Sequence, residues 1–185
     1  MTSEREKMIA GEFYDPLDPQ LMQDRRRAHL LCQRLNVTTE DELALRREIF
    51  SELFEAGGDS VWIESPFYYD YGDNITLGTS VFFNFDCVIL DVAPVSIGSQ
   101  TMFGPAVQIY AASHPMDWRE RAKGREFGKP ISIGSNVWVG GGVIISPGVT
   151  VGDRTVIGAG SVVTRDISDD VFAAGNPCRV IRELD

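Results

Sequence analysis

Apolar positions recur every six residues between Ile131 and Ile167. The hexads begin at Ile131, Val137, Val143, Val149, Thr155, Ser161 and Ile167. The third position of each complete hexad is a β-branched aliphatic residue, namely Ile133, Val139, Ile145, Val151, Ile157 or Val163. Residues two apart in a strand point to the same face. A short strand and a corner repeated with this period predict a parallel β-helix.

The residue after each third position is small, and glycine occupies it at Gly134, Gly140, Gly152 and Gly158. Glycine adopts the backbone conformations of tight corners without steric strain. We therefore expect these glycines to form the corners between successive strands.

The repeat extends upstream, in two blocks. One block has hexads beginning at Val95, Thr101 and Val107, and the other at Ile75, Val81 and Cys87. The register slips by two residues between the blocks, around Ala93-Pro94. Proline cannot donate to a strand ladder, which suits a break at this point.

Residues 113–130 interrupt the pattern with the charged, turn-rich segment SHPMDWRERAKGREFGKP. The flanking hexads keep a common phase, so this segment is predicted to be a loop extruded from the β-helix. Long loops inside compact domains are usually functional or disordered.

The first 58 residues have the periodicity of helices rather than of short strands. A helix is expected over 2–10, where Ser3 and Glu6 form a capping-box pattern. A second helix is expected from Asp18-Pro19. A third is expected to start from a second capping box, with Thr39 as its cap and Glu42 in its first turn, and to end at Gly57-Gly58.

Two regions follow from this pattern, a helical cap over 1–58 and a β-helix over 59–185. The β-helix is expected to continue to about Asp166. A tail over 167–185 would then leave the repeat at the turn sequence Gly175-Asn176-Pro177.

Composition and charge exclude several classes of protein. The chain has 185 residues and a formal net charge of −10, which disfavours nucleic acid and anionic membranes as partners. No apolar run approaches a membrane span, and the polar N-terminus does not resemble a signal peptide, so we expect a cytoplasmic protein. Three unclustered cysteines predict neither a disulfide framework nor a zinc site.

His114, at the start of the extruded loop, is one of two histidines and the strongest candidate for acid–base chemistry. A solvated loop histidine is the alternative. Three acids of the loop could assist it, or could simply be solvated: Asp117, Glu120 and Glu126.

Two polar residues upstream are further candidates. Asn84 replaces the usual small residue at a corner, where it either forms a turn or directs its amide into a cleft. Asp70 lies in the aromatic segment SPFYYDYGDN, which suits either a sugar ring or a bulky first coil with solvated acids.

Several separated motifs resemble the maltose and galactoside O-acetyltransferase family of hexapeptide-repeat acyltransferases. They are FYYDYGDNITLG, FFNFDCVILDV, YAASHPMD, GKPISIGSNVWVGGGVIISPGVTVGD, VIGAGSVVTRDI and AAGNPCRVIREL. The motifs occur in order and at family spacing over nearly the full length.

The resemblance implies a left-handed β-helix, an exception to the usual right-handed crossover. It also implies a homotrimer with active sites between subunits. Acetyl-CoA would donate its acetyl group directly to a sugar hydroxyl in a ternary complex, without an acyl-enzyme and without a metal. His114 matches the general base, Asn84 an orienting residue, and the Gly141 amide the donor to the thioester oxyanion.

The resemblance also implies binding residues, with the helical region 1–58 on the acceptor side. Asp15, Asp70 and Asn84 match sugar-contacting positions. The coenzyme positions match Gly141, Ala159, Thr164, Arg165, Arg179 and Arg182, and the arginines suit its phosphates. Asp70 and Val92 stand where the galactoside branch has a serine and an acid, so the chain is closer to the maltose branch.

Three other functions occur on β-helices of this kind. A γ-type carbonic anhydrase needs three histidine ligands for zinc, and the chain has two histidines. A scaffold or ice-binding β-helix predicts flat threonine ladders and no extruded loop. An acyltransferase for serine, an antibiotic or an amino-sugar differs mainly in its N-terminal region and acceptor-side residues, and it stays open as the alternative.

Overall fold

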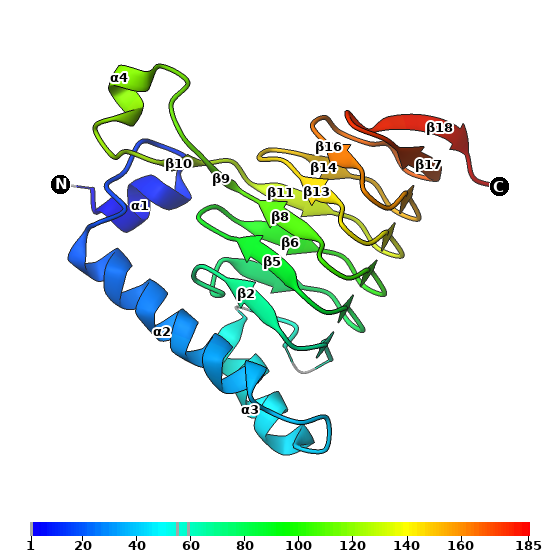
Figure 1. Ribbon diagram of the computed structural model, residues 1–185, viewed down its shortest axis with the longest axis horizontal. Helices are drawn as coiled ribbons and strands as arrows, with labels where there is room; N and C mark the ends of the chain where they lie inside the picture. Colours follow the sequence, from blue (N-terminus) through cyan, green and yellow to red (C-terminus); the bar gives the residue numbers. More distant parts are fainter. Residues whose placement is uncertain (1, 55, 59) are drawn as a thin grey trace.

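The main body of the computed structural model, which describes residues 2–54, 56–58 and 60–185, is a parallel β-helix (Figure 1). Its described strands form three sheets, one on each side of the coil. The seven-stranded sheet contains β1 (Trp62–Ile63), β4 (Phe82–Phe83), β7 (Met102–Phe103), β12 (Trp138–Val139), β15 (Val156–Ile157), β17 (Val171–Ala174) and β18 (Arg179–Glu183). The five-stranded sheet contains β2 (Phe67–Tyr69), β5 (Cys87–Leu90), β8 (Gln108–Tyr110), β13 (Ile144–Ile145) and β16 (Val162–Val163). The four-stranded sheet contains β3 (Ile75–Leu77), β6 (Val95–Ile97), β11 (Ile131–Ile133) and β14 (Thr150–Val151).

The strand pairing confirms the repeat and its slip. The chain visits the seven-, five- and four-stranded sheets in turn, so β4, β5 and β6 make one coil. Phe83 pairs in parallel with Phe103, whereas Val139 pairs with Ile157, so an upstream coil is two residues longer than a downstream one. The longer coil accommodates the two extra residues around Pro94. The predicted fold class, a mainly β parallel β-helix, is confirmed.

Side chains at the inward positions of the hexads fill the core, and in the first coils several of these side chains are aromatic. Phe83 is fully buried, stacks on Phe103 with ring centroids 4.6 Å apart, and lies 5.2 Å from Phe67. Polar residues at inward positions bond to corner carbonyls, as the Thr101 hydroxyl does to Gly134 (2.8 Å). These bonds offset the cost of burying a hydroxyl.

Close packing between coils, not corner conformation, explains the glycines that follow the strands. A Cβ on Gly140 would lie 2.6 Å from the amide nitrogen of Ala159 in the next coil. The left-handed φ falls two residues after the post-strand glycine, at Gly142 (67°) and Asn136 (58°). Glycine is therefore required after the strands because the next coil approaches closely. The expectation that these glycines adopt a special corner conformation is wrong.

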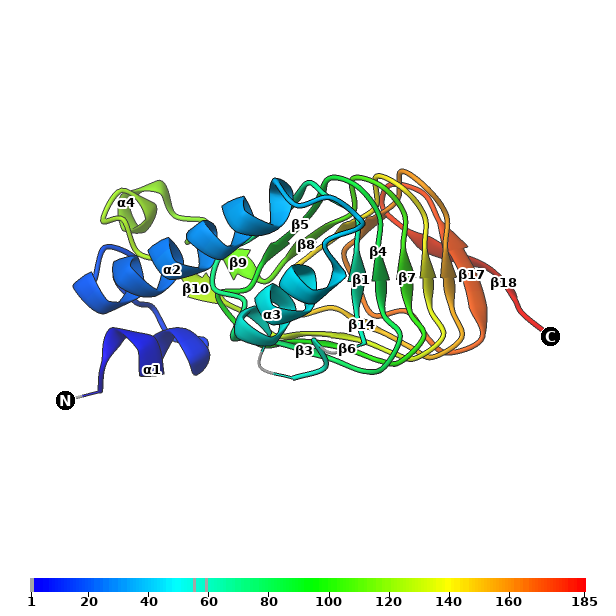
Figure 2. The same ribbon diagram turned by 90° about the horizontal axis from the view of Figure 1, so that it is seen from below.

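Helices cover the first coil, as predicted. The element α1 (Glu4–Ile9) starts from the expected capping box at Ser3, and α2 (Pro19–Asn36) starts from Asp18. Figure 2 shows α2 and α3 (Leu43–Leu53) at the end of the β-helix where the coils begin. The Tyr69 hydroxyl donates to the Ala28 carbonyl of α2 at 2.9 Å, which fixes this helix to β2.

Two predicted boundaries of the third helix are wrong. The Glu42 carboxylate accepts bonds from the amide and hydroxyl of Thr39, so the capping-box pair closes a turn before the helix, which begins at Leu43. The helix ends at Leu53, before Gly57-Gly58. The boundary predicted between residues 58 and 59 falls at Asp59, which lies outside the described residues.

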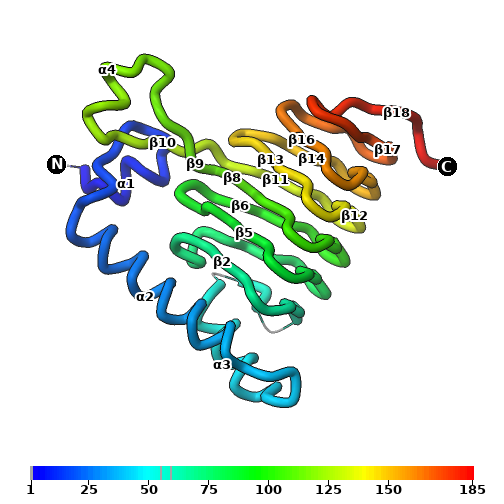
Figure 3. The backbone as a smooth tube through the Cα atoms, viewed as in Figure 1, coloured from blue at the N-terminus to red at the C-terminus, as the bar shows by residue number. Residues whose placement is uncertain are grey.

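The segment 113–130 does leave the β-helix, and Figure 3 shows its path. It carries a two-stranded antiparallel ribbon of β9 (Ala112–Ser113) and β10 (Phe127–Gly128), with the short helix α4 (Trp118–Arg121) at its tip. At the other end of the chain, β17 still pairs in parallel with β15, so coiling continues to Ala174 rather than ending at Asp166. Only β18 reverses direction and pairs antiparallel to β17.

Candidate active site

His114 directly follows β9, at the base of the extruded loop. Its side chain is 53% exposed, and its Nε2 lies 3.8 Å from Oε1 of Glu126. The other two loop acids bind elsewhere: Asp117 pairs with Arg119 at 3.0 Å, and Glu120 with Lys123 at 2.8 Å. Of the three loop acids, Glu126 is therefore the one that faces the histidine.

The N-terminal segment reaches this loop at Tyr14. The Tyr14 hydroxyl donates to Oε2 of Glu126 at 2.8 Å, and the two residues form an antiparallel bridge through their backbones. Asp15 follows directly and is exposed; its Oδ1 accepts the Leu17 amide at 2.9 Å, which closes a local turn. Asp15 therefore lies on the segment bridged to the loop of His114, as a sugar-contacting residue would need.

Asp70 borders a cavity of about 320 Å³ between α2 and the five-stranded sheet, which is lined by His29, Cys32, Gln33, Asn36, Tyr68, Tyr69, Asp70, Val88 and Leu90. Burial raises the pKa of Asp70 above its usual value. Its carboxylate also interacts electrostatically with His29 and Glu126. Within the aromatic segment, Tyr69 therefore packs in the core while Asp70 borders a cavity.

Asp91 positions Asp70 and was not predicted as part of a site. Its fully buried carboxylate accepts backbone N–H bonds from Asp70 (3.1 Å), Tyr71 (2.9 Å) and Gly72 (2.7 Å). Burial raises the pKa of Asp91 to about 7, although these amide bonds act in the opposite direction. An acid at the end of a strand, just before the Ala93-Pro94 break, was the signal available in the sequence.

Asn84 lies at a different edge, the corner between the seven- and five-stranded sheets. Its Oδ1 accepts the Phe85 amide at 2.8 Å, so it does form the turn that was one of its two interpretations. In the next coil the corner residue is Gly104, and a Cβ there would lie 2.6 Å from the amide nitrogen of Gly141. Asn84, Gly141 and Ala159 therefore follow one column of corners along the β-helix.

The backbone groups of Gly141 differ in their hydrogen bonding. Its carbonyl accepts the Gly160 amide at 2.9 Å, whereas its own N–H has no hydrogen-bond partner among the described residues. An unpaired amide at a corner is available to a ligand oxygen.

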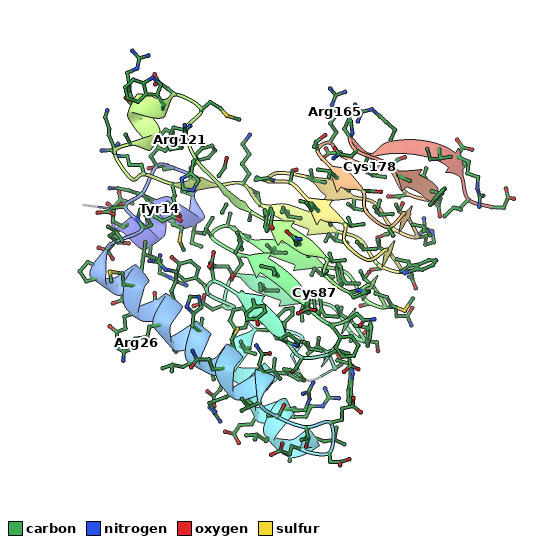
Figure 4. The ribbon with its side chains drawn as sticks, in the orientation of Figure 1. Tyr14, Arg26, Cys87, Arg121, Arg165 and Cys178 are labelled. Atoms are coloured by element: carbon green, nitrogen blue, oxygen red, sulfur yellow. The ribbon has the colours of Figure 1, made fainter. Side chains whose placement is uncertain are left out.

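The remaining coenzyme candidates lie at the last coils. Thr164 and Arg165 are exposed just beyond β16, and Arg179 and Arg182 are exposed on β18. The amide of Cys178, the residue before β18, donates to the Val162 carbonyl of β16 at 2.8 Å, so the start of β18 lies beside β16. Figure 4 labels Arg165 and Cys178 at this end of the chain. The three arginines thus lie exposed at the C-terminal end of the β-helix.

In one chain, however, the candidates divide between opposite edges of the five-stranded sheet. Asn84 precedes β5, whereas His114 follows the far end of the neighbouring strand β8. The extended chain from Gln108 to His114 alone spans on the order of 20 Å. Figure 4 shows the separation through Cys87, which opens β5, and Tyr14 beside the loop. A single chain does not bring the two together.

Comparison with known proteins identifies the family. Residues 7–58 match the maltose acetyltransferase hexapeptide capping motif, and residues 130–165 match the bacterial transferase hexapeptide (six repeats). The crystal structure of a maltose O-acetyltransferase from Clostridium difficile 630 is 47% identical, with a TM-score of 0.97 and coverage of 99% of this chain and 98% of that chain. The chain belongs to the maltose/galactoside O-acetyltransferase family.

Two further members of the fold are known with a coenzyme. A galactoside acetyltransferase in complex with coenzyme A is 38% identical, with a TM-score of 0.94 and coverage of 100% of this chain and 92% of that chain. A hexapeptide-repeat acetyltransferase from Vibrio cholerae O1 biovar eltor, complexed with acetyl coenzyme A, is 38% identical, with a TM-score of 0.91 and coverage of 99% of both chains. This chain is an acetyltransferase of that type.

In the described part of this acetyltransferase, no three histidine, cysteine or acidic side chains gather as a metal site would require. Nor does a helix of the described residues have the length and apolarity to cross a membrane.

Proposed function

We propose that this chain transfers the acetyl group of acetyl-CoA directly to a hydroxyl of a maltose- or glucose-like sugar. The single observation that carries the proposal is the placement of His114 at the base of a loop that Tyr14 ties to the acceptor-side segment. An imidazole titrates near neutral pH and can take a proton from a hydroxyl at that position.

The proposed chemistry is one displacement. His114 removes the proton of the sugar hydroxyl as its oxygen attacks the thioester carbonyl carbon. The carbon–sulfur bond then breaks, and coenzyme A leaves as the thiolate and is protonated to the thiol. No metal is needed for this step.

Two residues of the corner column would support the reaction. The Gly141 amide would donate to the oxyanion that forms on the thioester carbonyl, which is typically worth about 3 kcal/mol of barrier. Asn84, whose Oδ1 is held by its neighbour's amide, would use its NH₂ group to orient the reacting groups.

The same proposal assigns the binding residues. Asp15 and Asp70 would accept sugar hydroxyl bonds. Ala159 and Thr164 would line the coenzyme channel, and its phosphates would meet the guanidinium groups of Arg165, Arg179 and Arg182.

The separation of His114 from Asn84 supports an assembly of several copies. We propose a homotrimer in which His114 of one subunit meets Asn84 and Gly141 of its neighbour. Closed cyclic assemblies repeat one such junction between every pair of subunits. A cytoplasmic location stays a prediction.

An acceptor panel tests the substrate class. We expect acetyl-CoA with glucose or maltose to release free thiol faster than with galactosides, serine or chloramphenicol, because Asp70 and Val92 match the maltose branch. If serine or chloramphenicol were fastest, the alternative acceptor class would be correct. If no sugar raised thiol release above hydrolysis, the sugar proposal would be wrong.

A further inference from the structure

Glu126 is the least exposed carboxylate of the extruded loop. Its side chain is 25% exposed, whereas those of Asp117 and Glu120 are 43% and 51% exposed. The Tyr14 hydroxyl donates to its Oε2 at 2.8 Å, and Tyr14 itself is buried. Two backbone bonds between the same residues, 3.0 and 3.3 Å long, hold the pair in register. The carboxylate is therefore preorganised before any ligand binds.

The free oxygen of this carboxylate faces His114. Oε1 lies 3.8 Å from Nε2, a distance that gives electrostatic attraction without a direct hydrogen bond. Two other charged groups are close. The Arg121 guanidinium donates to the Pro115 carbonyl at 2.9 Å, and the Asp70 carboxylate interacts with Glu126 electrostatically.

We propose that Glu126, fixed by Tyr14, is the positioning residue of His114 and stabilises the imidazolium that forms when the histidine accepts the proton of the acceptor hydroxyl. A negative charge beside a group that becomes positive lowers the energy of the product state more than that of the starting state.

The role in catalysis rests on the proposed function, but the contact itself does not. It can be measured on the free protein, because the chain has two histidines and a variant of His29 assigns the two imidazole signals. Failure of the contact and failure of the sugar reaction are thus distinguishable.

The variant that tests it is Glu126→Gln, with Glu120→Gln as the matched control in the same loop. Glutamine keeps an oxygen to accept the Tyr14 hydroxyl but removes the charge. In Glu126→Gln we expect the imidazole proton signals of His114 to change their chemical shifts at a fixed pH, because the carboxylate charge 3.8 Å from Nε2 is removed. The same signals should not move in Glu120→Gln.

In the reaction, Glu126→Gln should lower kcat about tenfold and leave the acceptor KM within about twofold. Tyr14→Phe should lower kcat by a smaller factor, because Glu126 keeps its charge but loses the hydroxyl that holds its carboxylate in place. His114 signals that are unchanged in Glu126→Gln would overturn the proposal. An acceptor KM that rises while kcat is kept would overturn it too, because Glu126 would then bind the sugar itself.

Discussion

Replacing His114 with alanine is expected to lower kcat about a thousandfold at saturating acetyl-CoA and sugar. General-base catalysis contributes about 10²- to 10⁴-fold, and alanine leaves no group to accept the hydroxyl proton. The side chain is half-exposed and contacts the loop rather than the core, so the fold should persist. Steady-state thiol release measures the rate, and the thermal midpoint checks the fold.

Coenzyme binding provides the internal control for this variant. The proposed coenzyme residues, such as Arg165 and Arg179, lie at the last coils and not in the loop, so the dissociation constant for coenzyme A should change by less than about twofold. His114→Asn should be as slow as His114→Ala, because an amide is not a base at neutral pH. Full activity in either variant would remove His114 from the proton transfer.

Replacing Phe83 with alanine is expected to lower the free energy of unfolding by about 4 kcal/mol. Phe83 is fully buried in β4, between the rings of Phe67 and Phe103, and its loss leaves a cavity that short strands on three sides cannot close. Denaturant unfolding followed by far-ultraviolet circular dichroism measures the change.

Ile181→Ala is the control for this cost. Ile181 is 60% exposed on the terminal strand β18, so its truncation should change the free energy of unfolding by about 0.5 kcal/mol or less. If Phe83→Ala lowered the free energy of unfolding by less than about 1 kcal/mol, the aromatic stack would not stabilise the first coils.

The β-helix could be predicted from the periodicity, because the sequence of each hexad alone shows which of its positions face inward. Ile133 and Val139 face inward in successive sheets without reference to the rest of the chain. Even the slip near Pro94 was visible, since it changes the phase of every later hexad.

Features that depend on contacts between distant segments were predicted less well. Glu42 occurs three residues after Thr39, as in a capping box, yet the helix begins after Glu42 and the pair closes the preceding turn. The coil that ends at Ala174 lacks the hexad spacing, so only its pairing with β15 reveals it.

The candidate site, too, could be predicted only in part. The loop and corner patterns indicated His114 and Asn84, and the resemblance to a family supplied the coenzyme residues by position, but neither gave their spatial relation. The choice of Glu126 among three loop acids depends on Tyr14, which lies 112 residues away in the sequence. Because no local pattern encodes such a contact, it could be found only in the structure.

On this account, each active site joins His114, at the base of the extruded loop of one subunit, to Asn84 and Gly141, at the corners of the next. Mixed trimers of His114→Ala and Asn84→Ala subunits, co-expressed with different tags and purified through both, test this claim most directly. Each mixed trimer would contain one junction with an intact His114 and an intact Asn84, so about one third of the wild-type activity should return. Activity no higher than that of either variant alone would contradict the claim, because both residues would then have to act within one chain.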